Sequence, residues 1–360
     1  MVFEQVYSPD RHKYLGYMNT LMNKYFLSRK KCEAKGFISD CSGKVVSSHT
    51  ISKKFLRRIA SKDGHVYCFD DRLFGFEERN GKIGLKKVGI SDASTNKLFC
   101  RQHDNSLFRS IEDEELIPDE NQCLRLTYRA LMLERHHKES QFYFWSDMAH
   151  AEHPVFDCEF SKIMLESSRN ALMDSDLINS IICAAITNND VSKFRALRIY
   201  FGKKPGVLCA GAFFPEYDFC GSRLWGIHSI VPNPEIISIN IVALSGDNHN
   251  NHNGVAIVSW FDNAGQNYCK QFVDSMHSIA KADVSNILIH TVFEFIENVC
   301  ISPSWWHSRE KITQNALLHL HAVRRHSPLY YKEIGIQYDN WNTTDVQLWN
   351  GQNWISYSFS

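Results

Sequence analysis

The chain has 360 residues, a formal net charge of zero, and 44% hydrophobic and 22% charged residues. This is the composition of an ordinary globular protein, and the sequence contains no run of eighteen apolar residues, which argues against a membrane span. The length favours two domains, or one domain with an appended module. The first residues include Glu4 and no apolar segment, so they do not resemble a secretory signal and we expect a cytoplasmic protein.

Residues 1–118 begin with an apolar helical pattern over 14–27 and a short strand over 44–50 that ends at His49. A basic helix over 51–60, a strand over 64–70, an Asn80-Gly81 hairpin turn and a helix over 99–113 follow. In the last helix we expect four residues to face inward: Phe99, Leu107, Phe108 and Ile111. The acidic segment 112–122, which contains Pro118, is a natural boundary, so we predict one module over 1–118 and a second over 119–360.

The second module is predicted to be an α+β domain with a mainly antiparallel sheet. Helices are expected over 123–140, 159–173, 269–281, 286–300 and 307–323. Strands rich in β-branched and aromatic residues are expected over 194–202, 206–214, 237–244 and 254–262. The segments between these strands are too short or too polar for crossover helices, which favours antiparallel pairing.

Positive charge gathers in the first module. Residues 1–62 hold thirteen lysines and arginines against four acidic residues. The helix over 51–60 places Lys53, Lys54, Arg57 and Arg58 on one face. Such a segment on a neutral protein is typical of a phosphate-backbone binder, and the alternative is an ordinary solvated face.

Four residues of the first module are candidate zinc ligands: Cys32, Cys41, Cys100 and His103. Cys100 and His103 form a C-x2-H pair, which is one half of a Cys3His site. Cys32 and Cys41 have eight residues between them, so their loop needs the turns that Gly36 and Gly43 permit. The competing interpretation is two core cysteines and a surface histidine. The chain has eleven cysteines, an odd number in a reducing compartment, so we expect no disulfide framework.

The knuckle cysteines, the strand ending in "SSHTIS" and the segment "LFCRQHD" that enters a helix together resemble the ββα-metal (treble-clef) core of HNH endonucleases. The resemblance covers residues 30–112. It implies a zinc-stabilised HNH-like ββα module, with His49 as general base, Asn96 as the residue that positions it, and Asp104 as the ligand of a catalytic Mg²⁺ or Mn²⁺ ion. It also implies a nucleic-acid substrate, with DNA favoured over RNA, and a setting in bacterial anti-phage defence.

One departure bears on activity. The residue before the base is usually an acidic or histidine metal ligand in that family, whereas Ser48, a poor ligand for Mg²⁺, stands here. Three roles therefore stay open for His49: general base, zinc ligand in a Cys2His2 set with Cys41, Cys100 and His103, or structural residue.

The sequence therefore predicts a metal-dependent nuclease with structural zinc. Its second module is expected to act in sensing a signal, in binding a protein partner or in forming homo-oligomers. The first alternative is a non-catalytic, zinc-stabilised module that binds nucleic acid or protein. The second is an enzyme of unknown type in the second module, where Glu216, Tyr217, Asp218 and Cys220 lie together near a strand end.

Overall fold

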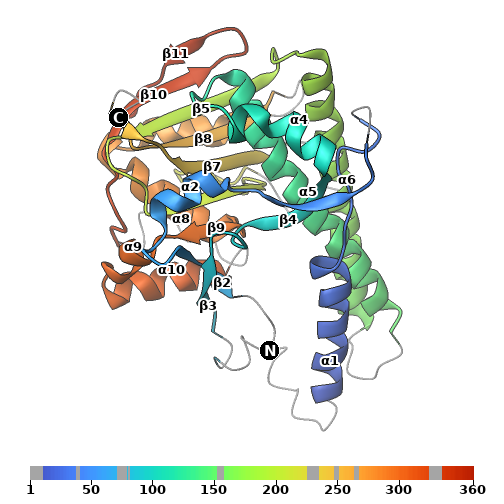
Figure 1. The fold of residues 1–360 in the computed structure, drawn as a ribbon. Helices are drawn as coiled ribbons and strands as arrows, with labels where there is room; N and C mark the ends of the chain where they lie inside the picture. Colours follow the sequence, from blue (N-terminus) through green and yellow to red (C-terminus); the bar gives the residue numbers. More distant parts are fainter. Residues whose placement is uncertain are drawn as a thin grey trace.

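The computed structural model is built around an open, nine-stranded antiparallel sheet (Figure 1). It describes residues 11–37, 41–70, 79, 82–151, 158–224, 235–246, 251–262, 267–323 and 335–360. The strand order is β11-β10-β5-β8-β7-β6-β9-β2-β3. The strands are β2 (His65–Asp70), β3 (Gly84–Gly89), β5 (Phe194–Phe201), β6 (Val207–Phe213), β7 (Ile237–Ala243), β8 (Gly254–Phe261), β9 (Val299–Ile301), β10 (Thr343–Trp349) and β11 (Trp354–Ser356). A mixed α/β fold with a mainly antiparallel sheet is thus confirmed.

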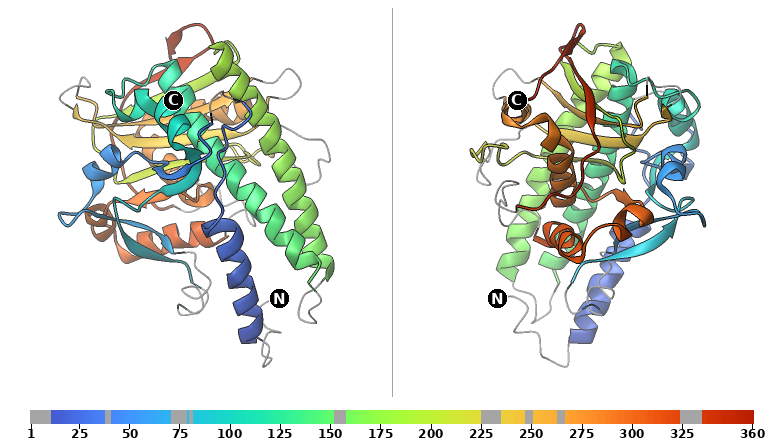
Figure 2. Two further views of the ribbon diagram at one scale, coloured as in Figure 1. Left: turned by 45° about the vertical axis from the view of Figure 1, so that its right-hand side comes forward. Right: turned by 90° about the vertical axis from the view of Figure 1, so that its left-hand side faces the viewer.

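Helices cover both faces of the sheet centre. As a result, every residue of β6, β7 and β8 is buried. The helix α5 (Glu120–Ala149) packs against β5 to β8, and α8 (Val284–Phe295) packs against β6. Figure 2 shows α5 running beside α6 (Cys158–Asn188), with α1 (Arg11–Met22) near their far ends. The shorter helices are α7 (Tyr268–Ser275), α9 (Pro303–His307) and α10 (Lys311–Val323). The central strands therefore form the hydrophobic core against which the helices pack.

A second, two-stranded sheet carries the candidate site. The strand β1 (Val45–His49) pairs antiparallel with β4 (Thr95–Cys100), and α4 (Arg101–Glu112) follows β4 without a gap. Between β1 and β4 the chain inserts α2 (Lys53–Ile59) and the hairpin β2–β3. In β1–β4 the register places His49 opposite Thr95 and Ser48 opposite Asn96.

The inserted hairpin joins the first part of the chain to the second. Tyr67 of β2 pairs with Ile301 of β9, and a single hydrophobic core includes residues from Cys32 to Tyr357. The division of the chain into modules at residue 118 stays a prediction. The Asn80-Gly81 turn lies outside the described residues.

Several predicted elements have different ends in the structure. The predicted helix over 286–300 is wrong at its C-terminal end, because α8 ends at Phe295 and residues 299–301 form β9. There the pairing of β9 with β6 outweighs the local apolar pattern. The helix predicted over 269–281 likewise ends at Ser275, and no strand was predicted where β10 and β11 extend the sheet.

Candidate metal centre

The four predicted zinc ligands come together in the structure. The ligand atoms of Cys32, Cys41, Cys100 and His103 all lie within 4.8 Å of one another. Cys41 is half-buried and the other three are buried. A Cys3His cluster that could hold a metal such as zinc is thus confirmed, although its members are up to 71 positions apart in the sequence.

Two short segments place these ligands. Cys100 ends β4 and caps α4, where its Sγ accepts a hydrogen bond from the backbone N–H of His103 at 3.5 Å. Cys32 Sγ lies 3.2 Å from His103 Nδ1 and accepts from the N–H of Cys100 at 3.3 Å. Gly36 and Gly43 have φ values of 94° and 72°, so both adopt the left-handed backbone that the predicted turns require.

The donor set fits a structural zinc ion. In a tetrahedral site, zinc–sulfur and zinc–nitrogen bonds of about 2.3 and 2.0 Å place the ligand atoms roughly 3.5–3.8 Å apart, and the four ligand atoms here lie within 4.8 Å of one another. Burial raises the pKa of the Cys32 thiol. Burial also acts to raise the pKa of Cys100, but hydrogen bonds from Ser42 and the backbone of His103 outweigh it and lower that pKa. Cys100 is therefore more readily ionised for metal binding than Cys32.

The loop that carries Cys32 is fixed by a buried carboxylate. Glu33 Oε2 accepts from Arg135 Nη1 at 2.5 Å, and its Oε1 accepts from His136 Nδ1 at 3.0 Å. The backbone N–H of Glu33 donates to the carbonyl of Leu98 at 2.8 Å. His136 is buried. Its partner is 103 positions away, so no local signal identified the contact.

His49 lies at the end of β1 and is not one of the clustered metal ligands. Its Nε2 is 2.9 Å from the carbonyl oxygen of Ile90. A carbonyl oxygen only accepts hydrogen bonds, so Nε2 must carry the proton. In the neutral ring the lone pair is then on Nδ1, which is the atom that can take a proton.

Asp104 lies in the first turn of α4, near Ser48 and His49. Burial raises the pKa of its carboxyl group, against the opposing effects of Arg129, of a hydrogen bond from Ser48 and of His49. Its Oδ1 is buried and has no hydrogen-bond partner among the described residues. An unsatisfied buried carboxylate oxygen is an acceptor site for a cation or a bound donor.

Among the described residues, Asn96 makes a side-chain hydrogen bond to Thr50 and none to His49. Its Nδ2 donates to Thr50 Oγ1 at 3.1 Å, across the β1–β4 ladder. The imidazole of His49 is hydrogen-bonded to the carbonyl of Ile90, a contact that sequence reasoning missed because a backbone oxygen leaves no residue-type signal. The positioning role of Asn96 stays a prediction.

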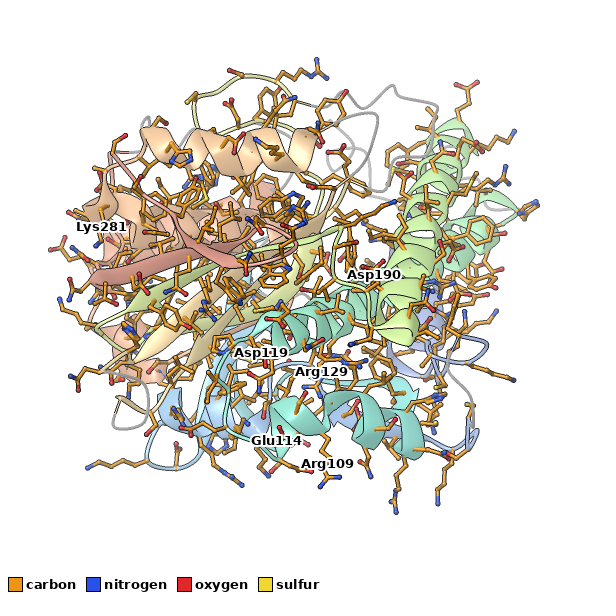
Figure 3. All side chains as sticks on the ribbon, turned by 90° about the horizontal axis from the view of Figure 1, so that it is seen from above. Arg109, Glu114, Asp119, Arg129, Asp190 and Lys281 are labelled. Carbon is orange, nitrogen blue, oxygen red and sulfur yellow. The ribbon has the colours of Figure 1, made fainter. Side chains whose placement is uncertain are left out.

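Arg129 was also missed. It projects from α5 toward α4 (Figure 3), where its guanidinium lies 4.0 Å above the ring of Phe108 and its Nη1 donates to Glu112 Oε1 at 2.6 Å. Ser52 donates to the other oxygen of Glu112 at 2.6 Å. Arg129 is buried, so it places a fixed positive charge beside both Glu112 and Asp104.

The four basic residues of α2 differ in their surroundings. Only Arg57 is exposed. Lys53 Nζ donates to Ser91 Oγ at 2.9 Å, and Lys54 Nζ donates to the carbonyl of Glu114 at 2.7 Å. Arg58 is half-buried, with its Nη1 buried and without a hydrogen-bond partner among the described residues. The predicted basic face is thus one exposed arginine beside three cations that point into the protein or contact it.

In the second module, Asp218 accepts from the N–H groups of Cys220 and Ser222 at 2.9 and 2.7 Å. It therefore stabilises a turn. None of the helices in the described part of the chain is long and apolar enough to cross a membrane.

Comparisons with known proteins give no family assignment. The chain matches no protein-family model, no curated protein and no solved structure.

Proposed function

We propose that this protein is a metal-dependent nuclease that hydrolyses nucleic-acid phosphodiesters, with His49 as the general base and Asp104 as a cation ligand. The observation that carries the proposal is the order β1–β4–α4, with His49 at the end of β1 and Asp104 in the first turn of α4, beside the Cys3His cluster. The two side chains are close enough to interact electrostatically.

The chemistry follows from these contacts. The carbonyl of Ile90 holds the proton of His49 on Nε2, which leaves Nδ1 to accept a proton from an attacking water. Asp104 Oδ1, which has no partner among the described residues, offers an oxygen ligand to Mg²⁺ or Mn²⁺. Such an ion supplies positive charge to the scissile phosphate. A zinc ion held by the four-ligand cluster would be structural, because three sulfurs and one imidazole would complete its coordination.

The resemblance to HNH endonucleases extends the proposal. It favours DNA over RNA as substrate, a cytoplasmic location and a role in bacterial anti-phage defence. The second module then senses, binds a protein partner or forms homo-oligomers.

The test is cleavage of plasmid DNA and of RNA with Mg²⁺ or Mn²⁺, by wild type and by His49→Ala. We expect His49→Ala to abolish cleavage while zinc content is retained. His150→Ala is the matched control, since His150 is an exposed histidine at the end of α5. Equal cleavage by wild type and His49→Ala would refute the assigned base.

A second candidate is a non-catalytic, zinc-stabilised module that binds nucleic acid. Two observations favour it: Ser48 occupies the usual ligand position and hydrogen-bonds Asp104, and the buried Arg129 already places a positive charge near that carboxylate. Nucleic-acid binding with zinc present, but without cleavage in any divalent metal, would support this candidate over the nuclease.

A further inference from the structure

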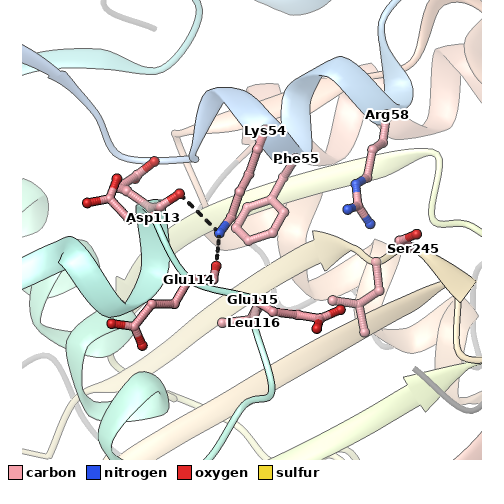
Figure 4. Close-up of a pocket in the computed structure, with 10 residues that line it drawn as sticks. Lys54, Phe55, Arg58, Asp113, Glu114, Glu115, Leu116 and Ser245 are labelled. Atoms are coloured by element: carbon pink, nitrogen blue, oxygen red, sulfur yellow. Dashed lines mark hydrogen bonds between the residues drawn. The ribbon is translucent and has the colours of Figure 1, made fainter. Parts of the chain in front are cut away.

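A pocket of about 350 Å³ lies between α2 and the C-terminal end of α4 (Figure 4). This volume is within the range of small-molecule pockets. Its apolar lining comes from Phe55, Leu116 and Leu244, all of which are buried. Its polar lining comes from Lys54, Arg58, Glu112, Asp113, Glu114, Glu115 and Ser245.

Arg58 offers hydrogen-bond donors to this pocket. Its guanidinium points into the space toward Ser245 and Glu115 (Figure 4). The Nη1 atom is buried and has no hydrogen-bond partner among the described residues. A buried donor without a partner costs free energy, so a ligand that accepts from Arg58 would be stabilised there. Lys54 is not such a donor, because its Nζ already donates to the carbonyl of Glu114.

The acidic side chains exclude a simple anion as the ligand. Glu115 lines the pocket close enough to Arg58 for its charge to act on the guanidinium, and Asp113 and Glu114 add negative charge. A phosphate would be repelled by these carboxylates. The ligand must instead present acceptors to Arg58, donors to Glu115 and apolar faces to the lining.

We propose that the pocket takes a guanine base of a bound nucleic-acid strand. Guanine presents two adjacent acceptors, O6 and N7, which an arginine fork matches. Its N1–H and N2–H donors lie on the neighbouring edge and suit a carboxylate. Adenine has an amino group in place of the O6 acceptor, so it matches the arginine less well. Cytosine presents its donor and its acceptors on one edge only, so it suits Arg58 and Glu115 together less well.

The pocket adjoins the proposed nuclease site. Glu112 lines the pocket and accepts from Ser52, which lies three residues after His49. A strand whose phosphate lies at His49 could therefore place a nearby base in the pocket. This inference rests on the proposed function, because that function supplies the bound nucleic-acid strand. It adds a preference for one base to the proposed function.

The first experiment measures binding of guanosine 5′-monophosphate by calorimetry, with adenosine and cytidine 5′-monophosphates as comparisons and no divalent metal. We expect saturable binding that prefers guanosine, and a loss of about tenfold to a hundredfold in affinity for Arg58→Ala. Glu115→Gln should also weaken binding. Arg109→Ala is the matched control, because Arg109 is exposed on α4, outside the pocket (Figure 3). Equal affinity for the three nucleotides, or unchanged affinity in a folded Arg58→Ala, would overturn the proposal.

A second arm uses single-stranded DNA 8-mers that contain one guanine or, in its place, one adenine. Tighter binding of the guanine oligonucleotide by the His49→Ala variant would support a strand-borne base. Binding of the free nucleotide without preference between the oligonucleotides would overturn that assignment. Neither binding assay needs cleavage. Failure of the nuclease proposal would therefore appear in the cleavage assay, and failure of the guanine proposal would appear in the binding assays.

Discussion

His136 donates from Nδ1 to Glu33 Oε1 at 3.0 Å, and both side chains are buried. This contact joins α5 to the loop that carries Cys32. Arg135, on the same turn of α5, donates to the other oxygen of Glu33 and pairs with Asp176 of α6 at 2.6 Å. The candidate zinc loop is therefore tied to the two longest helices of the described chain through one carboxylate.

We expect Glu33→Gln to lower the free energy of unfolding by about 1.5–3 kcal/mol, because Arg135 and His136 lose the charged acceptor of two buried hydrogen bonds, while Arg135 keeps its pairing with Asp176. Chemical denaturation measures the change. Glu166→Gln is the control, since Glu166 pairs with Arg169 on the exposed surface of α6, and it should change stability by less than about 0.5 kcal/mol. Equal stability of the two variants would contradict the role of the buried carboxylate.

Purified protein should contain about one zinc ion per chain, bound by the Cys3His cluster. Cys100→Ser should reduce the zinc content to near zero, because a hydroxyl is a much poorer zinc ligand than a thiolate. Elemental analysis gives the stoichiometry. Cys220→Ser should keep the metal, since Cys220 is an exposed thiol outside the cluster. Wild-type protein without zinc after expression in zinc-supplemented medium would refute the metal centre.

Asp104→Asn should stabilise the fold at neutral pH. Burial raises the folded-state pKa of Asp104, so the native state holds its proton more tightly than the unfolded chain does. Stability is therefore lost as pH rises from the unfolded value of about 3.9 through the folded pKa, and it stays lost above that pH.

Chemical denaturation of both proteins across this pH range measures how the stability difference between Asp104→Asn and wild type changes with pH. The advantage of Asp104→Asn over wild type should be absent at low pH and should grow as pH rises. Comparison at each pH cancels effects common to both, such as protonation of the zinc ligands. An advantage that shrank with rising pH would contradict the assignment.

Lys54 and Arg57 should behave differently although both belong to the predicted basic face. Lys54→Met should lower stability by about 1–2 kcal/mol, because the carbonyls of Glu112 and Glu114 lose their donor. Arg57→Ala should leave stability nearly unchanged and reduce the slope of log affinity for DNA against log salt by about 1. Arg169→Ala, on the remote α6, is the control for the slope.

Residue type and spacing predicted the zinc ligands because sulfur and imidazole ligands are few and chemically specific. The "CRQH" pair lies on one helix start, and the glycines needed for the Cys32–Cys41 loop are visible in the sequence. The strands β5 to β8 were predicted because each is rich in β-branched, aromatic and other apolar residues.

The partners of these residues could not be predicted in the same way. Arg129, Arg135 and His136 come from one helix whose pattern shows only that it is long and partly apolar. Their roles depend on which face α5 turns toward α4 and the zinc loop, which is a property of tertiary packing. The strands β10 and β11 were missed because their burial is irregular and because the pairing of β10 with β5 spans more than 140 residues.

The pairing of Tyr67 with Ile301 has a consequence for synthesis of the chain. On the ribosome, the hairpin β2–β3 emerges more than 200 residues before the strand that covers its inner edge. Until then that edge is unpaired and open to wrong partners. Because this hairpin is inserted between β1 and β4, the segment that carries the Cys3His cluster gains its pairing with the large sheet only after β9 has been translated.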